Sequence, residues 1–163
     1  MVVVLFVHPD LGIGGAERLV VDAALALQSH GHTVTILTAH HDPKHCFTET
    51  VDGRVCVVSA GDWLPRSIAG RCHALCATVR MLYLAVYLIM FWTCDVVVVD
   101  QVSSPLPLLR AWGLPTLFYC HYPDLLLTEG RVGLTSKVRF IQIKHRILQL
   151  DWLLLLKGSQ SDR

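Results

Sequence analysis

The apolar residues of the chain fall into short runs that predict buried strands alternating with helices. The run 2–7 consists of aliphatic and aromatic residues, mostly β-branched, which is typical of a strand covered on both faces. Residues 16–30 instead repeat their apolar positions at helical spacing, and Gly31 follows where a helix cap is expected. A second strand is predicted at 32–38. Strand, glycine-rich turn, helix and strand in this order predict a right-handed, parallel βαβ unit.

Three further apolar runs predict the rest of the sheet. Strands are expected at 55–59, 95–100 and 115–121, and a short helix is expected at 106–112. The order of these elements indicates an α/β fold with an open, doubly wound, Rossmann-like parallel sheet. The length of 163 residues allows one such domain with a modest core.

The segment 74–92 is nearly all apolar and admits three interpretations. Its uncharged part, 81–92, would form about 18 Å of helix, which is too short to cross a bilayer core of about 30 Å. Extending it backwards would place the Arg80 charge within the span, which is unfavourable. The segment is therefore a buried crossover helix, a helix lying in the membrane surface, or a membrane span. The second interpretation would place three aromatic residues at headgroup level: Tyr83, Tyr87 and Trp92.

Composition and charge exclude two classes of protein. Apolar residues make up 53% of the chain and charged residues 17%, whereas disordered chains are poor in apolar residues. The formal net charge is only +1. A nucleic-acid partner is not expected, because such binding needs a basic face to replace the counterions of the phosphates.

A glycine-rich turn joins the first predicted strand to the first helix. Gly12, Gly14 and Gly15 could expose backbone N–H groups at the start of a helix, where the helix dipole favours an anion such as a diphosphate. The alternative is that the glycines only permit a tight turn. A dinucleotide-binding site is disfavoured because Glu17 occupies the last glycine or alanine position of that motif, and the second strand does not end in an acidic residue.

Four ordered segments carry a family resemblance. Residues 8–20 look like the opening of the retaining glycosyltransferases of family 4. Residues 118–127, together with 60–65 and 95–101, make the chain similar to the alpha-mannosyltransferases of asparagine-linked glycosylation within that family. The resemblance covers about residues 2–128.

The resemblance implies a domain organisation. Residues 1–128 are expected to be the Rossmann-like, acceptor-side domain of a two-domain glycosyltransferase of the GT-B type. Residues 129–163 are expected to form a divergent basic and apolar tail, either a helix on a membrane or a read-through sequence with no evolved role. The second domain, which binds the nucleotide sugar, is expected to be absent from the chain, so that the chain alone would be inactive.

The resemblance also implies an activity. Mannose would pass from GDP-mannose to a dolichyl-diphosphate-linked oligosaccharide, forming alpha-1,3 and alpha-1,6 bonds, at the cytosolic face of the endoplasmic reticulum membrane. No cofactor is expected beyond the donor substrate. Expected partners are the lipid-linked oligosaccharide, the membrane surface and other glycosyltransferases of the same pathway. The alternative is a non-catalytic, membrane-associated module that binds partner glycosyltransferases or lipid-linked sugar.

Several residues are candidates for the chemistry of glycosyl transfer. In the family it resembles, the histidine matching His121 contacts the transferred sugar or the leaving phosphate; the alternative for His121 is a buried core histidine. Gly14 and Gly15 could offer backbone N–H groups to the diphosphate, since preorganised donors stabilise a leaving group.

Three acidic residues complete the candidate site. Asp10 is expected to place the acceptor or else to stabilise the glycine turn. Glu17 would repel a diphosphate, so we expect it to point away from the site or to bind a sugar hydroxyl. Asp124 is expected to bind an acceptor hydroxyl or to cap a helix. The histidines at 40–45 are interpreted as a polar loop, and no metal site is expected.

Overall fold

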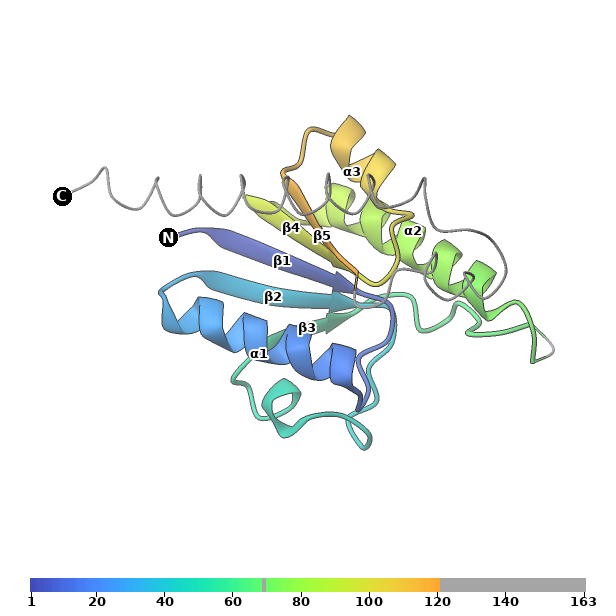
Figure 1. The fold of residues 1–163 in the computed structure, drawn as a ribbon, viewed down its shortest axis with the longest axis horizontal. Helices are drawn as coiled ribbons and strands as arrows, with labels where there is room; N and C mark the ends of the chain where they lie inside the picture. The colour runs from blue at the N-terminus through green and yellow to red at the C-terminus, as the bar shows by residue number, and fades with distance from the viewer. Residues whose placement is uncertain (69, 121–163) are drawn as a thin grey trace, which may run out of the picture. The chain divides into compact units, whose positions relative to one another are not determined.

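The computed structural model describes residues 1–68 and 70–120, which form a five-stranded sheet with helices on both faces (Figure 1). All four neighbouring strand pairs are parallel, in the order β3-β2-β1-β4-β5. The predicted Rossmann-like α/β class is therefore confirmed. The elements in chain order are β1 (Val3–His8), α1 (Gly15–Ser29), β2 (Thr33–Thr38), the 3-10 turn η1 (Thr48–Thr50), β3 (Cys56–Ser59), α2 (His73–Phe91), β4 (Val96–Asp100), α3 (Leu106–Ala111) and β5 (Thr116–Tyr119).

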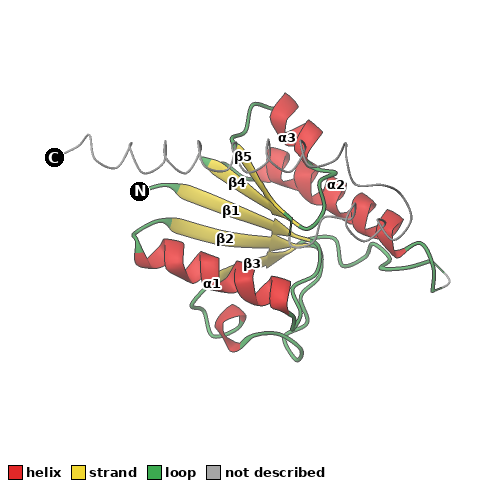
Figure 2. Cartoon of the chain, in the orientation of Figure 1, coloured by secondary structure: helices red, strands yellow, loops and turns green. Residues whose placement is uncertain are grey.

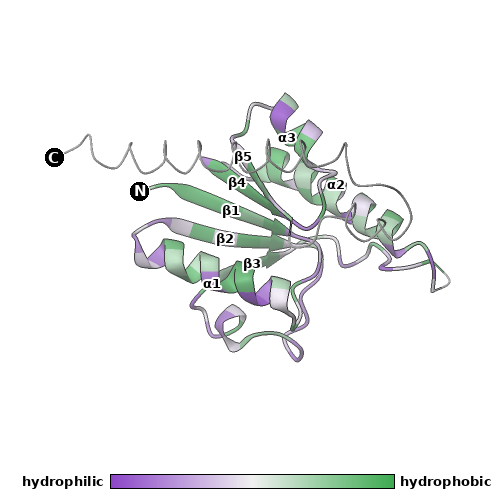
Figure 3. Ribbon diagram, in the orientation of Figure 1, coloured by the Kyte–Doolittle hydropathy of each residue, from purple (hydrophilic) through white to green (hydrophobic). Residues whose placement is uncertain are grey.

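The sheet separates two apolar cores, one under each layer of helices. Along β1, Leu5 and Val7 enter the core covered by α2 and α3, whereas Val4 and Phe6 enter the core covered by α1. This alternation is the period of two expected of a strand buried on both faces. Figure 2 shows the resulting layers, and Figure 3 shows the strands as the most apolar part of the described chain.

The first helix has the boundaries that the sequence predicts to within a residue. Its apolar positions Val20, Val21 and Ala24 are buried against the sheet. The helix ends before Gly31, whose φ of 83° lies in the left-handed region that glycine adopts without strain. Gly31 therefore ends α1 and turns the chain into β2.

The apolar segment around Arg80 forms α2, which is the crossover helix between β3 and β4. Its buried residues recur at helical spacing: Cys76, Arg80, Met81, Leu84, Ala85 and Leu88. The last four of these belong to the core that contains residues of β1 and β4. Within the described residues, α2 is also a helix long and apolar enough to cross a membrane. Because one face packs along the sheet, the structure confirms the crossover interpretation. The membrane-surface and membrane-span interpretations stay predictions.

The opposite face of α2 stays apolar although it is not covered by the described chain. Five exposed residues form a stripe along it, called here the α2 stripe: Leu75, Val79, Leu82, Val86 and Met90. The aromatic residues expected at headgroup level behave differently. Tyr83, Tyr87 and Trp92 are partly buried against the core, and their expected place at headgroup level stays a prediction. Tyr83 and Tyr87 stack on each other with ring centroids 6.3 Å apart.

The strand order places the expected ligand site at one edge of the sheet. The chain passes from β1 to β2 and β3 on one side of β1, and then crosses back to β4 and β5 on the other side. The boundary between β1 and β4 is therefore the switch point of the sheet. Ligands of open α/β sheets bind outside the carboxyl ends of the strands at such a point. The polar residues His8 and Asp100 end β1 and β4 there. The predicted tail 129–163, the boundary at 128, His121 and Asp124 lie outside the described residues.

Candidate functional site

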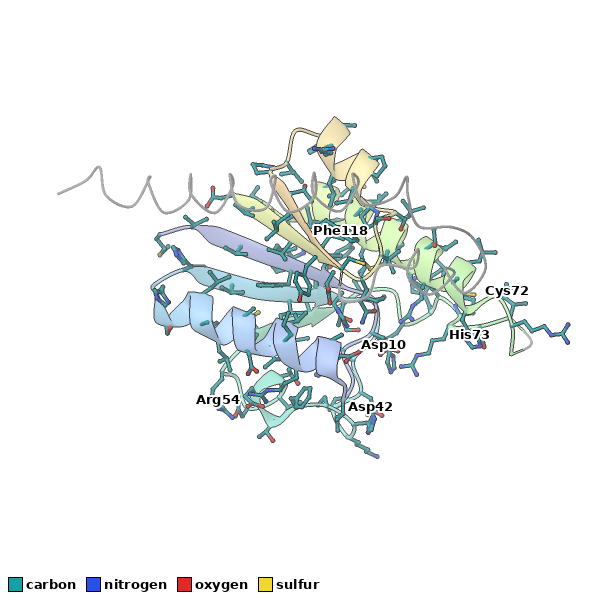
Figure 4. All side chains as sticks on the ribbon, viewed as in Figure 1. Asp10, Asp42, Arg54, Cys72, His73 and Phe118 are labelled. Atoms are coloured by element: carbon teal, nitrogen blue, oxygen red, sulfur yellow. The ribbon has the colours of Figure 1, made fainter. Side chains whose placement is uncertain are left out.

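A polar pocket of about 290 Å³ lies at the carboxyl edge of the sheet, which is near the lower end of the range for small-molecule sites. The loops after β1, β2 and β3 and the first turn of α1 build it. Figure 4 shows Asp10 and Asp42 at this edge. The residues that line it are Asp10, Gly12, Ile13, Glu17, His40, Asp42, His45 and Arg66.

Acidic side chains dominate the charge of this pocket. Asp10, Glu17 and Asp42 contribute three carboxylates, and Arg66 contributes the guanidinium. Arg66 lies 3.3 Å from Asp10 in an exposed ion pair. Ionised carboxylates only accept hydrogen bonds, so they suit the hydroxyl groups of a sugar and oppose an anion. The pocket lining therefore favours a polyhydroxylated ligand.

The carboxylate of Glu17 lies over the glycine turn and not away from the site. Glu17 is in the first turn of α1 and lines the pocket. A Cβ atom added to Gly14 would collide with this carboxylate. The expectation that Glu17 points away from the site is thus wrong, while binding of a sugar hydroxyl stays a prediction. A diphosphate at Gly14 would meet the negative charge of Glu17.

Glu17 is connected to a buried pair at the switch point of the sheet. The Nδ1 atom of His8 donates a hydrogen bond to Asp100 Oδ2 over 2.9 Å, and both residues are almost completely buried. The other ring nitrogen, Nε2, lies 3.6 Å from Glu17 Oε1. Burial lowers the pKa of His8, but the hydrogen bond to Asp100 and the carboxylate of Glu17 outweigh it, so the net pKa of His8 is raised above 6.5.

The glycines of the turn are not required by the backbone. Gly12, Gly14 and Gly15 all avoid positive φ, and Gly14 has an extended backbone that any residue can adopt. A left-handed backbone therefore does not explain these glycines, and the interpretation that they only permit a tight turn stays a prediction. A Cβ atom at Gly15 would meet nothing within 4 Å, although alanine is the more favourable residue in a helix. The missing side chain leaves open space beside the start of α1.

The histidines after β2 are polar loop residues. His40 Nδ1 lies 2.6 Å from Asp62 Oδ1, and His41 Nε2 lies 3.0 Å from Thr50 Oγ1. Within residues 1–68 and 70–120, no group of three histidine, cysteine or acidic side chains could hold a metal ion. His40 and His45 nevertheless line the pocket, a role that the sequence analysis did not assign to them.

The structure brings Asp10 and Glu17 together in one pocket, with Gly14 beneath the Glu17 carboxylate. Sequence reasoning missed the contribution of His8 and Asp100, which are 92 positions apart along the chain. A signal existed, because each of them is the polar last residue of a buried strand. Only the order and register of the strands makes these two ends neighbours.

Comparisons with solved structures concern the fold of the chain. It is similar to the glycosyltransferase SsfS6 of Streptomyces sp. SF2575, solved with thymidine diphosphate, with a TM-score of 0.53 and 17% identity over 77% of this chain and 41% of that one. The C-terminal domain of a hydrogenase from Pyrococcus furiosus gives the same score at 18% identity, over 72% and 90%. At these identities the likeness concerns the fold alone, which is that of a Rossmann-like lobe of GT-B glycosyltransferases.

The sequence itself defines the family more closely. The sequence model of Glycosyltransferase Family 4 matches residues 13–156, which is most of the chain. The chain therefore belongs to glycosyltransferase family 4.

Curated relatives share about half of their aligned residues with the chain. The protein of Mus musculus named Alpha-1,3/1,6-mannosyltransferase ALG2 is 49% identical over 98% of this chain. Proteins of the same name from Homo sapiens and Rhizomucor pusillus are 56% and 54% identical, each over 77% of this chain. The matches cover 38%, 31% and 28% of these relatives, so the chain spans about a third of their length. All three relatives carry the name of a transferase.

Proposed function

We propose that the chain provides the acceptor side of an alpha-mannosyltransferase of N-glycan precursor assembly. Mannose would pass from GDP-mannose to a dolichyl-diphosphate-linked oligosaccharide through alpha-1,3 and alpha-1,6 bonds. The observation that carries this proposal is the acidic pocket beside the glycine turn, in a family 4 chain about half identical to curated enzymes of that name. Residues 1–128 would form the acceptor-side lobe, and residues 129–163 would follow it as a separate tail.

Within this lobe the acidic side chains would bind the sugar of the acceptor. Asp10 and Glu17 line one pocket, and carboxylates accept hydrogen bonds from hydroxyl groups. His8, held by Asp100, lies next to Glu17, with its Nε2 atom 3.6 Å from Glu17 Oε1. Positioning one acceptor hydroxyl relative to the donor would reduce the entropic part of the barrier.

The remaining site residues keep the roles that the family resemblance implies. Gly14 and Gly15 keep the predicted role of offering backbone N–H groups to the diphosphate, and a Cβ atom at Gly15 would fill open space beside the start of α1. His121 would contact the transferred sugar or the leaving phosphate, and Asp124 would bind an acceptor hydroxyl. GDP-mannose would enter as a substrate, and the chemistry proposed needs no cofactor.

A lipid-linked acceptor requires an enzyme that works at a membrane surface, and α2 offers a suitable face. The α2 stripe exposes aliphatic side chains on consecutive turns; Val86 is 45% exposed and Met90 is 69% exposed. Contiguous exposed apolar residues mark sites of interaction with membranes or proteins. A helix packed on the sheet by one face and resting on lipid by the other would hold the pocket near the membrane, as an interfacial helix does. The membrane would be that of the endoplasmic reticulum, on its cytosolic face.

A hybrid enzyme tests this function directly. In it, this chain replaces the aligned part of the mouse relative, and mass spectrometry follows the addition of hexoses from GDP-mannose to a lipid-linked oligosaccharide. We expect two successive additions. Glu17→Gln should raise the KM for the acceptor about tenfold, since hydrogen bonds to charged groups contribute about 1.5–3 kcal/mol.

The matched control is Asp22→Asn, which changes an exposed carboxylate on the outer face of the same helix. It should leave the KM unchanged. A hybrid enzyme that folds and reaches the level of the unmodified relative, yet transfers no hexose, would contradict the proposal.

A further inference from the structure

Arg80 is a buried arginine that has no anionic partner among the described residues. Only 4% of the residue is exposed, and its Nε atom has no hydrogen-bond partner. None of the ion pairs within the described ranges, up to 4.0 Å, includes Arg80. Buried charges are normally paired and hydrogen-bonded, because removing an ion from water is unfavourable. The packing of α2 therefore gives no reason for a guanidinium at this position.

The position of Arg80 along α2 brings it to the same sheet edge as the pocket. Two residues earlier, the carbonyl of Thr78 accepts a hydrogen bond from Ser104 Oγ, in the loop after β4. One turn later, the ring of Tyr83 contacts Gly61, in the loop after β3. Arg80 thus lies level with the carboxyl ends of the strands.

The charges around Arg80 leave it in an electrostatically unfavourable position. Burial lowers the pKa of Arg80, the carboxylates of Asp10 and Asp62 oppose this effect, and the guanidinium of Arg66 adds to it. Asp10 is already paired with Arg66 at 3.3 Å. Two guanidinium groups therefore act on one region of the sheet edge, where Asp10 is already paired with Arg66 and Asp62 with His40. A multiply charged oxyanion would satisfy both.

We propose that Arg80 and Arg66 form an anion site of the diphosphate class beside the acidic pocket. A guanidinium presents a planar fork of N–H donors that matches phosphate oxygens in pairs. The carboxylates of Glu17 and Asp42 next to it repel an anion and attract hydroxyls. The complete site therefore takes a diphosphate joined to a sugar. The guanidinium groups would bind the diphosphate, and the carboxylates would bind the sugar hydroxyls. The assignment of the sugar rests on the proposed function, whereas the anion site does not.

Titration of the whole 163-residue chain with inorganic pyrophosphate tests the anion site. Arg80→Met should weaken binding about tenfold or more, because a charge-assisted hydrogen bond is lost. Arg80→Lys should bind with intermediate affinity, since it keeps the charge and loses the fork. The matched control is Arg110→Met, an exposed arginine in the last turn of α3, which should bind as the unmodified chain does. Absence of pyrophosphate binding by the unmodified chain, or equal binding by Arg80→Met, overturns the proposal.

Thermal unfolding separates an anion-binding arginine from a structural one. Without ligand, Arg80→Met should unfold at the same or a higher temperature than the unmodified chain, because it removes an unpaired buried charge. Pyrophosphate should raise the unfolding temperature of the unmodified chain and leave that of Arg80→Met unchanged. A ligand-free Arg80→Met chain that is less stable or fails to fold shows a structural role and overturns the proposal.

Two further ligands identify the source of the diphosphate. Tighter binding of geranyl diphosphate than of GDP assigns the site to a lipid-linked diphosphate, and the reverse order assigns it to a nucleotide. Failure of the anion site and failure of the proposed function are distinguishable. Arg80-dependent pyrophosphate binding without mannose transfer by the hybrid enzyme leaves the anion site standing and contradicts the proposed function. Mannose transfer by the hybrid enzyme without Arg80-dependent pyrophosphate binding refutes the anion site and leaves the proposed function standing.

Discussion

Replacement of Gly15 by alanine distinguishes an effect on the stability of the fold from an effect on ligand binding. Gly15 is the first residue of α1, has no positive φ, and would place a Cβ atom in open space. Alanine is more favourable than glycine in a helix by about 1 kcal/mol in the interior, and we expect about half of this at the first turn. For a chain of this size, such a gain raises the unfolding temperature by about 1–2 °C. The same methyl group would stand where the substrates approach.

We therefore expect Gly15→Ala to be more stable and less active. Urea or thermal unfolding of the whole chain measures the first effect, and mannose transfer by the hybrid enzyme measures the second. The control is Gly31→Ala at the other end of α1. Gly31 also has open space around a Cβ atom, but its φ of 83° makes alanine strained, so stability should fall by about 1 kcal/mol while transfer stays unchanged. A stable Gly15→Ala hybrid enzyme with full activity would refute the idea that this turn is kept bare for a ligand.

Two further predictions concern the buried histidine and the α2 stripe. Because the pKa of His8 is raised in the folded state, its pair with Asp100 contributes fully to stability below pH 6.5. This contribution is lost as the pH rises through the folded-state pKa, so the free energy of unfolding measured in urea titrations should fall over that range. His8→Asn should abolish this pH dependence and His30→Asn, an exposed control, should not; an unchanged slope in His8→Asn argues against the pair. On the α2 stripe, Val86→Asp should reduce sedimentation of the chain with phospholipid vesicles, whereas Val51→Asp, at a similarly exposed valine away from α2, should have no effect. Equal vesicle binding by both variants would contradict a role of the α2 stripe in membrane binding.

The strands and helices followed from the sequence because their signals are local. Continuous β-branched runs define β1 and β4, and the helical spacing of buried residues defines α1. The crossover role of α2 was one of three open interpretations. The choice depended on tertiary packing, since an apolar helix on a sheet and one in lipid have similar compositions. The turn η1 was not predicted, because three residues without apolar periodicity carry little signal.

The site was less accessible to sequence reasoning because it depends on contacts between distant residues. Asp10 and Glu17 could be selected from their position in the glycine turn. The pairing of His8 with Asp100 needed the register of β1 against β4, which aligns Val7 with Val99. The burial of Arg80 depended on which face of α2 meets the sheet. Side-chain direction also mattered, because the carboxylate of Glu17 covers Gly14 and alters what that turn can bind.

The most direct test of the central claim is the affinity of the chain for the sugar of a lipid-linked acceptor. A dolichyl-type, diphosphate-linked oligosaccharide in detergent micelles would be titrated into the whole chain and into Asp10→Asn and Glu17→Gln variants. Asp22→Asn serves as the control. The account predicts that both pocket variants lose about tenfold in affinity relative to the control, while the bare lipid diphosphate binds all chains equally. Equal affinity of all variants for the oligosaccharide would contradict it.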